Sequence, residues 1–332
     1  MSVLALLIRP IAYLGLPAYL LHRLSASSPV ARYYVRLSLY ISTLGLVSAW
    51  GAIASVAMSL AGRRYDVNYV VARTFYAIAS RVMGIKISVE GAEHLETRPA
   101  VFVGNHQSML DILYLGRIFP MRASIMAKKE LQWMPLLGQF MTFSGAVFVD
   151  RGNNAKAIRS LAAAGEAMRE RATSLWLFPE GTRSMREHHD MLPFKKGAFH
   201  LAVQAGVPIV PVICENYWRL YRKGVFESGT LKIKVLPPVP TTGLTVADVA
   251  DLAVRVHDQM VAALREISDP STARPPRSPA GPAPASDSPP AREKQRENSA
   301  VEAPLRRREG SENGTETEED EGMVLVGRPG AR

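Results

Sequence analysis

The chain is organised around one turn, Gly104-Asn105-His106-Gln107-Ser108-Met109-Leu110-Asp111. An apolar run at 100–103 comes just before this turn and is typical of a buried strand. The apolar spacing at 109–118 predicts a helix just after it. His106 therefore lies between a strand and a helix, where rigid α/β scaffolds collect their functional groups.

The spacing between His106 and Asp111 predicts where each must lie if the two side chains interact. Five residues of one straight helix turn through about 500°, which puts the two side chains on different faces. They meet only if His106 is in the loop and Asp111 is in the first helical turn, with Ser108 as N-cap and Asp111 completing a capping box. Such a carboxylate would fix the tautomer of His106 and stabilise its protonated form. On this motif alone, an ordinary loop histidine beside a helix cap is the alternative.

Apolar strands alternate with helices from residue 85 onward. We expect strands at 100–103, 124–127, 146–149, 174–178, 209–213 and 231–236, and helices at 109–118, 154–171, 197–205 and 245–266. This alternation predicts an α/β fold with a mostly parallel central sheet covered by helices.

The N-terminal region is strongly apolar. Residues 37–61 contain no charged side chain and are long enough to cross a hydrocarbon core with some tilt, so we expect a membrane helix there. A buried core helix is the alternative. Residues 3–21 form a weaker span. The basic amphipathic pattern at 67–83 predicts a helix that lies in the membrane interface or packs on the domain.

The composition changes near the C-terminus. Residues 270–290 are rich in Pro, Ala and Ser, and 306–321 run from arginines into an acidic block. Such segments bury too little apolar surface to order themselves. We therefore expect N-terminal membrane-anchoring segments at 1–64, an α/β domain at 65–268 and a disordered tail at 269–332.

Basic residues are concentrated in the body of the chain. Residues 1–269 hold 30 Lys and Arg against 19 Asp and Glu, whereas the remainder holds 10 against 11. A basic body suits nucleic acid, an anionic membrane surface or phosphorylated substrates. The sequence shows no zinc-finger spacing, no RNA-binding signature and no helix-turn-helix pattern, so nucleic acid is the weaker option.

Two further stretches place polar side chains after apolar strands. The run 145–151 ends in Arg151, whose guanidinium suits a phosphate; a surface ion pair with Asp150 is the alternative. The run 175–184 ends in a turn in which Gly181 would let the backbone approach a ligand. A polar turn without function is the alternative for this second run.

Together these stretches resemble the glycerolipid acyltransferases. The NHxxxxD block of that family matches 105–111, and its second, third and fourth blocks match 145–151, 178–184 and 207–212 in the same order. The likeness covers about residues 85–215 and points to the fungal-type lysophosphatidate acyltransferases.

The resemblance implies a reaction and a set of site residues. A fatty acyl group would pass from acyl-CoA, as co-substrate, to the sn-2 hydroxyl of 1-acyl-sn-glycerol-3-phosphate, giving phosphatidic acid and CoA. Glycerol-3-phosphate or another lysophospholipid is the alternative acceptor. His106 would be the catalytic base and Asp111 its partner, without a bound cofactor or metal. The residues expected to bind substrate are Asn105, Lys128, Arg151, Glu180, Gly181, Thr182, Arg183 and Lys195.

The resemblance also implies an integral membrane protein of the endoplasmic reticulum, with the lipid droplet as the alternative location. Its partners would be the two substrates and membrane lipids. A hydrolase that uses Ser108 or Ser184 as nucleophile is a competing class, against which the lack of a Gly-x-Ser-x-Gly elbow argues. A non-catalytic membrane adaptor with the same fold is a third.

Overall fold

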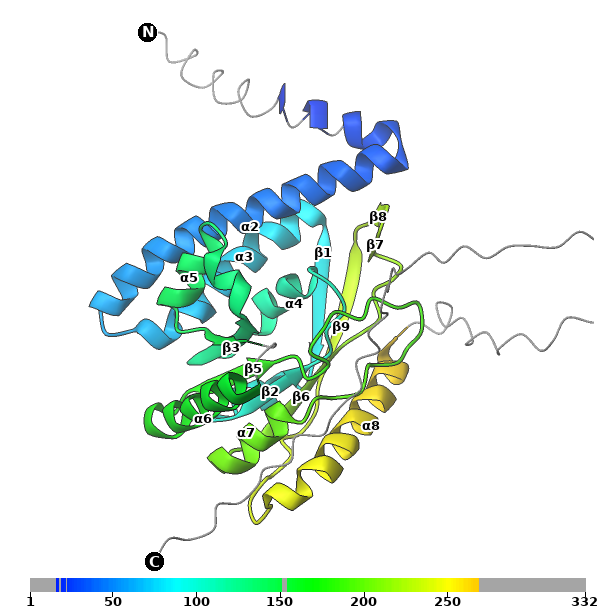
Figure 1. Ribbon diagram of the computed structural model, residues 1–332. Helices are drawn as coiled ribbons and strands as arrows, with labels where there is room; N and C mark the ends of the chain where they lie inside the picture. Colours follow the sequence, from blue (N-terminus) through cyan, green and yellow to red (C-terminus); the bar gives the residue numbers. More distant parts are fainter. Residues whose placement is uncertain (1–15, 18, 22, 151–153, 269–332) are drawn as a thin grey trace, which may run out of the picture. The chain divides into compact units, whose positions relative to one another are not determined.

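A seven-stranded sheet forms the centre of the computed structural model, which describes residues 16–17, 19–21, 23–150 and 154–268 (Figure 1). Its strands, in spatial order, are β1 (Ile85–Glu90), β9 (Gly229–Val235), β6 (Ile209–Cys214), β2 (Val101–Gly104), β5 (Ser174–Leu177), β3 (Ala123–Lys128) and β4 (Val147–Val149). A separate hairpin consists of β7 (Tyr221–Arg222) and β8 (Val225–Phe226).

The sheet is mostly parallel, as the sequence predicts. Only β6 and β9 pair antiparallel; the other pairs are parallel. Strands β2 to β6 therefore run in one direction, and β1 and β9 run in the other. The common carboxyl edge of strands β2 to β6 is where a parallel sheet usually builds its functional site.

Helices cover both faces of this sheet (Figure 1). On one side lie α2 (Pro29–Leu60), α3 (Val67–Met83), α4 (Asp111–Ile118) and α5 (Leu137–Phe143). On the other side lie α6 (Asn154–Arg171), α7 (Gly197–Ala205) and α8 (Val249–Ile267). Short 3₁₀ segments are η1 (Arg64–Asp66), η2 (Ala92–Glu96), η3 (Lys129–Trp133) and η4 (Val246–Asp248).

Alternate residues of the central strands point into two separate cores. Phe102 and Trp176 are buried together with α2, α3 and α4, and their rings stack with centroids 6.0 Å apart. Val101, Val103 and Leu175 are buried with α6, α7 and α8 on the opposite face. Burial on both faces explains why these strands are continuous apolar runs rather than alternating ones.

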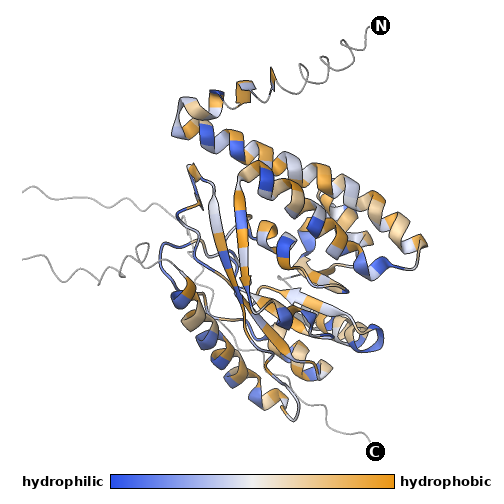
Figure 2. Ribbon diagram, turned by 180° about the vertical axis from the view of Figure 1, so that it is seen from behind, coloured by the Kyte–Doolittle hydropathy of each residue, from blue (hydrophilic) through white to orange (hydrophobic). Residues whose placement is uncertain are grey.

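Helix α2 has one face packed on the domain and another exposed. Tyr40, Val47 and Ala54 are buried in the core that also contains the sheet, while Leu46 and Ile53 are 74% and 65% exposed. Figure 2 shows hydrophobic residues along the length of this helix. It is the one described helix long and apolar enough to cross a membrane, and 33% of its most apolar window is buried.

A hydrogen bond joins α2 to the central turn of the sequence. The Tyr40 side chain is fully buried, and its hydroxyl donates to the Met109 carbonyl oxygen at 3.0 Å. Met109 precedes Asp111 by two residues. The apolar helix and the turn are therefore in direct contact.

The observed elements differ from the expected ones in a few places. Helices α3, α6 and α7 occupy the predicted ranges. Strand β1 and helix α5 lack a counterpart in the sequence prediction. Helix α3 packs against α2 and α4, which agrees with the alternative that the helix at 67–83 packs on the domain. The tail at 269–332 and most of the expected span at 3–21 lie outside the described residues. The expected division into three parts stays a prediction.

Candidate active site

The polar turns follow three neighbouring parallel strands of the sheet. Strands β6, β2 and β5 are adjacent, and their last residues lead into Glu215, Asn105 and Phe178. Because parallel strands end at the same edge, segments far apart in the sequence meet there.

His106 and Asp111 lie in hydrogen-bond contact, as their spacing predicts. His106 is in the loop after β2, Asp111 is the first residue of α4, and Nδ1 lies 2.7 Å from Oδ2. The Asp111 side chain is 1% exposed and that of His106 is 18% exposed. The imidazole stacks on Phe178, with ring centroids 4.0 Å apart. Nε2 has no hydrogen-bond partner within the described part of the chain and is the nitrogen available to a substrate.

Asp111 accepts several hydrogen bonds at once. Its Oδ2 accepts from the backbone N–H groups of Gln107 at 2.8 Å and Ser108 at 3.1 Å, and its Oδ1 lies 2.6 Å from the Tyr217 hydroxyl. Backbone N–H groups only donate, so this carboxyl group acts as an acceptor. The proton of the His106–Asp111 pair then belongs on Nδ1, which leaves the lone pair of His106 on Nε2.

Glu180 connects the loops after β2 and β5. Its side chain is 3% exposed. One carboxylate oxygen accepts from the backbone N–H of His106 at 2.7 Å, and the other accepts from the Ser184 hydroxyl and from the backbone N–H of Leu192 at 3.0 Å. Burial raises the pKa of Glu180 above its ordinary value, although these hydrogen bonds oppose the shift. Its expected contact with substrate stays a prediction; the observed contacts hold His106 in place.

Asn105 is likewise engaged within the protein. Its side-chain amide donates to the Cys214 carbonyl at 2.9 Å and accepts from the Cys214 N–H at 2.8 Å, and it is 2% exposed. The Gln107 side chain donates to the carbonyls of Cys214 and Glu215. These bonds join the ends of β2 and β6, and the substrate contact expected of Asn105 stays a prediction.

Cationic side chains gather around the turn at Gly181. Gly181 has φ +71°, and a Cβ there would lie 2.9 Å from Lys195 Cδ, so the turn requires glycine. Thr182, Arg183 and Lys195 are exposed. Within the described residues, neither Arg183 nor Lys195 forms an ion pair. Both cations are therefore available to an anionic ligand.

The structure does not place the other two cations expected to bind substrate at the turn around Gly181. Lys128 ends β3, which β5 separates from β2, and its ammonium lies 3.3 Å from a Glu130 carboxylate oxygen. Arg151 lies outside the described residues. The structure thus brings together His106, Asp111 and the turn that follows β5, with Lys128 farther along the same edge.

Comparison with known proteins identifies the family. Residues 86–215 match the family model described as Acyltransferase. The chain is 42% identical over 237 residues to the 1-acyl-sn-glycerol-3-phosphate acyltransferase of Saccharomyces cerevisiae, covering 71% of this chain and 78% of the yeast protein. The chain belongs to the 1-acyl-sn-glycerol-3-phosphate acyltransferase family.

Further members of this family agree in sequence and fold. The human 1-acyl-sn-glycerol-3-phosphate acyltransferase alpha is 38% identical over 253 residues, which are 75% of this chain and 87% of the human protein. The crystal structure of the 1-acyl-sn-glycerophosphate (LPA) acyltransferase PlsC from Thermotoga maritima is 26% identical, with a TM-score of 0.57 and coverage of 69% of this chain and 94% of that chain. The family resemblance drawn from the sequence is confirmed.

Ser108 does not have the role that the sequence predicts. Helix α4 begins at Asp111 with Leu110 in the N-cap position, so the prediction of Ser108 as N-cap is wrong. Half of the expected capping box exists, because the Ser108 N–H donates to Asp111. The hydroxyl instead accepts from the Leu110 N–H at 3.0 Å and lies 2.8 Å from the hydroxyl of Tyr217.

Tyr217 is a part of the site that sequence reasoning missed. It is fully buried, and its pKa is raised well above the ordinary value by burial and then by the charge of Asp111. The phenol therefore stays protonated and can donate to Asp111 throughout the working pH range. The signal available in the sequence was its position shortly after the apolar run 209–213, at the same edge as His106.

The contacts of the candidate nucleophiles argue against an acyl-enzyme in this family member. The Ser184 hydroxyl donates to Glu180 and lies 3.1 Å from the carbonyl of His106. Burial, followed by the charges of Asp111 and Glu215, raises the pKa of the Cys214 thiol well above its usual value. Among the described residues, the imidazole of His106 hydrogen-bonds only to Asp111.

A metal centre is not found within the described ranges. Within them, His, Cys, Asp and Glu side chains form no group of three or more that is suited to a metal ion. The arrangement instead offers a base, an oriented carboxylate and exposed cations, which is a set suited to acyl transfer onto a phosphate-bearing acceptor.

Proposed function

We propose that this protein transfers a fatty acyl group from acyl-CoA to the sn-2 hydroxyl of 1-acyl-sn-glycerol-3-phosphate, producing phosphatidic acid and CoA. The yeast and human relatives are named for action on this acceptor. The observation that carries the proposal is the contact of 2.7 Å between His106 and Asp111, which leaves Nε2 free beside exposed cations.

The proposed mechanism is direct transfer in a ternary complex. A hydroxyl is a poor nucleophile at neutral pH and needs a positioned base. His106 Nε2 takes the hydroxyl proton while the oxygen attacks the thioester carbonyl, and Asp111 stabilises the imidazolium through Nδ1. The tetrahedral intermediate expels CoA thiolate, which receives the proton from His106. Because a thiolate is a good leaving group, a covalent acyl-enzyme is not required.

The phosphate of the acceptor is proposed to bind at the turn around Gly181. The guanidinium of Arg183 and the ammonium of Lys195 offer charge-assisted hydrogen bonds. Arg151 is proposed to contribute from the loop after β4, and Lys128 from the end of β3. Glycerol-3-phosphate carries the same phosphate and remains the alternative acceptor.

We further propose that α2 anchors the protein in the membrane. Its exposed face presents Trp50, Ile53 and Leu60, and neighbouring segments add Trp133 on η3 and Phe143 at the end of α5. Exposed apolar surface of this extent is typical of a lipid interface. Both substrates carry acyl chains, so attachment to a membrane brings the enzyme to them. The endoplasmic reticulum is the proposed location, and the lipid droplet is the alternative.

Alkaline carbonate washing of membranes tests the anchoring. The full-length protein should stay in the pellet, because an apolar helix held in lipid is not extracted by removing electrostatic contacts. Recovery of folded protein in the supernatant would contradict membrane insertion through α2.

A lysolipid panel tests the reaction. Purified protein is given labelled acyl-CoA with lysophosphatidate, lysophosphatidylcholine or glycerol-3-phosphate, and the products are identified. Phosphatidate should dominate, and the His106→Ala variant should form it at least about 10²-fold more slowly. Preferred acylation of glycerol-3-phosphate would support the alternative acceptor, and hydrolysis of acyl-CoA without any acylated product would contradict both.

A further inference from the structure

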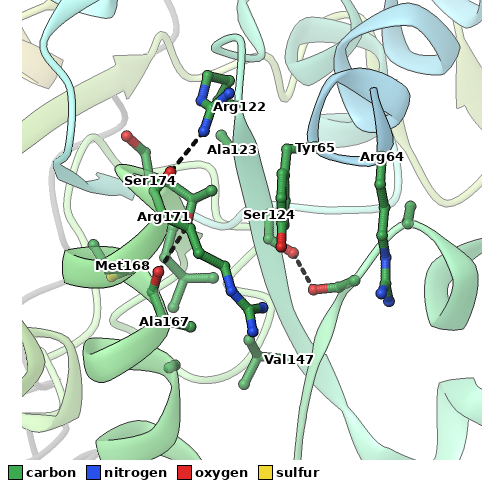
Figure 3. Close-up of a pocket in the computed structure, with 15 residues that line it drawn as sticks. Arg64, Tyr65, Arg122, Ala123, Ser124, Val147, Ala167, Met168, Arg171 and Ser174 are labelled. Carbon is green, nitrogen blue, oxygen red and sulfur yellow. Dashed lines mark hydrogen bonds between the residues drawn. The ribbon is translucent and has the colours of Figure 1, made fainter. Parts of the chain in front are cut away.

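A second polar site lies at the opposite edge of the sheet. A cavity of about 90 Å³ is lined by Ser124 near the start of β3, Val147 at the start of β4, Ser174 at the start of β5 and Met168 near the end of α6 (Figure 3). The four residues of β5 separate this cavity from the loop at Phe178 by about 13 Å at the usual rise of a strand. The cavity is therefore separate from the candidate active site.

Three arginines surround the cavity. Arg64 lies in η1, Arg122 precedes β3 and Arg171 ends α6; each is exposed. The guanidinium carbons of Arg122 and Arg171 lie 5.7 Å and 5.9 Å from the ring centroid of Tyr65. Figure 3 shows the three arginines arranged around this tyrosine. Side chains from three distant parts of the sequence thus concentrate positive charge at one cavity.

This positive charge lacks an acidic counterpart. In the described part of the chain, no carboxylate lies within ion-pair distance of Arg64, Arg122 or Arg171. Like charges close together repel, and the repulsion is relieved when an anion binds between them. Arginine forks also match the geometry of phosphate oxygens.

The backbone beside the cavity adopts an unfavourable conformation. Arg122 has φ +53° and Ala172 has φ +47°, a region that residues other than glycine rarely enter. One bond that holds this arrangement runs from the Arg122 guanidinium to the Arg171 carbonyl oxygen at 2.6 Å. Strained backbone of this kind is retained where the surrounding structure enforces it, often at binding sites.

We propose that Arg64, Arg122 and Arg171 form a binding site for a phosphate monoester, distinct from the acceptor site near His106. The phosphate can belong to a lipid headgroup or be free in solution. Leu60, at the end of α2 and four residues before Arg64, is 86% exposed, so the site adjoins the surface proposed to contact lipid. An acidic lipid such as phosphatidate would reach it without entering the active site.

Thermal melting of the full-length protein in mixed micelles of detergent and lipid tests the proposal. Micelles are used because α2, the proposed membrane anchor, would hold every variant on a vesicle. The Arg64→Gln/Arg171→Gln variant keeps Arg122, which donates to the end of α6. Its control is Lys223→Gln/Arg255→Gln, which removes the same charge from exposed residues outside the cavity. The lipid in the micelles is phosphatidylcholine alone, or phosphatidylcholine with either phosphatidate or phosphatidylglycerol.

The cavity variant should need about tenfold more phosphatidate than the control for the same rise in melting temperature, because exposed charge-assisted hydrogen bonds are lost. Binding to phosphatidylcholine should be equal for both. An equal loss on phosphatidylglycerol would show general attraction to negative charge and overturn the phosphate site. Identical behaviour of the two variants with every lipid would rule out a headgroup as the ligand and leave only a free phosphate.

A second measurement distinguishes a free phosphate from a lipid. In detergent, inorganic phosphate should raise the melting temperature of the control more than that of the cavity variant if the site takes free phosphate. A loss confined to micelles that contain phosphatidate assigns the site to a headgroup. Either of these two results supports the site, whereas the absence of both overturns it. The single variant Arg64→Gln, whose side chain makes no recorded hydrogen bond in the described chain, repeats the test with the least risk to folding.

Discussion

The two ends of the same parallel strands hold their polar groups in opposite ways. At the carboxyl edge, Asp111 and Glu180 are 1% and 3% exposed, and each accepts several hydrogen bonds. At the amino edge, Arg64, Arg122 and Arg171 are exposed and make few bonds. Proton transfer requires atoms fixed within a few tenths of an ångström, whereas attraction of a phosphate tolerates mobile side chains.

This difference predicts how the two edges respond to mutation. Removing one member of a buried network leaves its partners without hydrogen bonds, which is costly where water cannot replace them. Removing one exposed cation leaves nothing buried and unsatisfied. Substitutions at the carboxyl edge should therefore have large and specific effects, and those at the amino edge small and additive ones.

The largest effect is expected at His106. His106→Ala should lower the acylation rate by about 10²–10⁴-fold or more, because general base catalysis contributes this much. Asp111→Asn should lose most of the activity as well, since the amide cannot stabilise the imidazolium. Release of CoA measures the rate, and circular dichroism checks that both variants are folded. Substantial turnover by folded His106→Ala would remove the histidine from the mechanism.

The next effect concerns the bracing carboxylate. Glu180→Ala should destabilise the protein by about 2–5 kcal/mol, because two backbone N–H groups and one hydroxyl lose their acceptor. Glu180→Gln should lose less, since its carbonyl oxygen still accepts. The melting temperature measures both. A Glu180→Ala variant that melts like the wild type but no longer binds the acceptor would show that this side chain serves substrate instead of the loops.

The stability difference at Glu180 should also depend on pH. Burial raises the pKa of Glu180 in the folded state. The folded protein therefore binds the proton of the Glu180 carboxyl group more tightly than the unfolded chain does. In the unfolded chain a glutamate has a pKa of about 4.3. The resulting stabilisation is complete below that pH and is lost as the pH rises through the folded-state pKa. The melting temperature of the wild type should thus fall relative to that of Glu180→Gln as the pH rises from about 4 to 7.

A smaller effect is expected at Tyr217. Tyr217→Phe removes the hydroxyl that lies 2.6 Å from Asp111 but keeps the ring. With one donor fewer, the carboxylate holds the imidazolium proton more tightly, so the acidic limb of the pH–rate profile should move to higher pH by less than about one unit. The Michaelis constant for lysophosphatidate should be unchanged. A uniform loss at every pH would indicate a packing role only.

The smallest effect is expected from the C-terminal segment. A chain ending at Asp269 should keep nearly full activity, because the described residues complete the sheet and the His106–Asp111 network among themselves. This truncation retains Ser268, whose hydroxyl accepts from the backbone N–H of Asn216 at 3.0 Å. Loss of turnover in a folded truncated chain would assign the segment a role in the site.

The elements that the sequence predicts are those encoded by local patterns. The bounds of α6 and α7 follow from the helical spacing of their own residues, and the contact of His106 with Asp111 follows from a spacing of five. The approach of Tyr217 to Asp111 spans 106 positions and depends on how β2 and β6 are paired. The spacing of neighbouring residues does not show which strands pair, so this contact could not be predicted from it.

One error and one omission have the same physical origin. Ser108 has the residue type of an N-cap, but its hydroxyl accepts from the Leu110 N–H two residues on and also contacts the distant Tyr217, and α4 begins only at Asp111. The contacts of Glu180 with the loop at His106 were not predicted either, while its expected contact with substrate stays a prediction. Its burial, which turns it into a brace for His106, becomes visible only after the three loops are assembled.

The hydrogen bond from Tyr40 to Met109 has a practical consequence for producing the enzyme. Deleting an apolar N-terminal helix is the usual route to a version that can be handled without detergent. Here the same helix contributes Tyr40, Val47 and Ala54 to the core and holds the backbone two residues before Asp111. A shortened enzyme would lose the proposed membrane anchor and the support of the turn between His106 and Asp111 together. Solubility therefore has to be sought by changing the outer face of α2 and leaving Tyr40, Val47 and Ala54 intact.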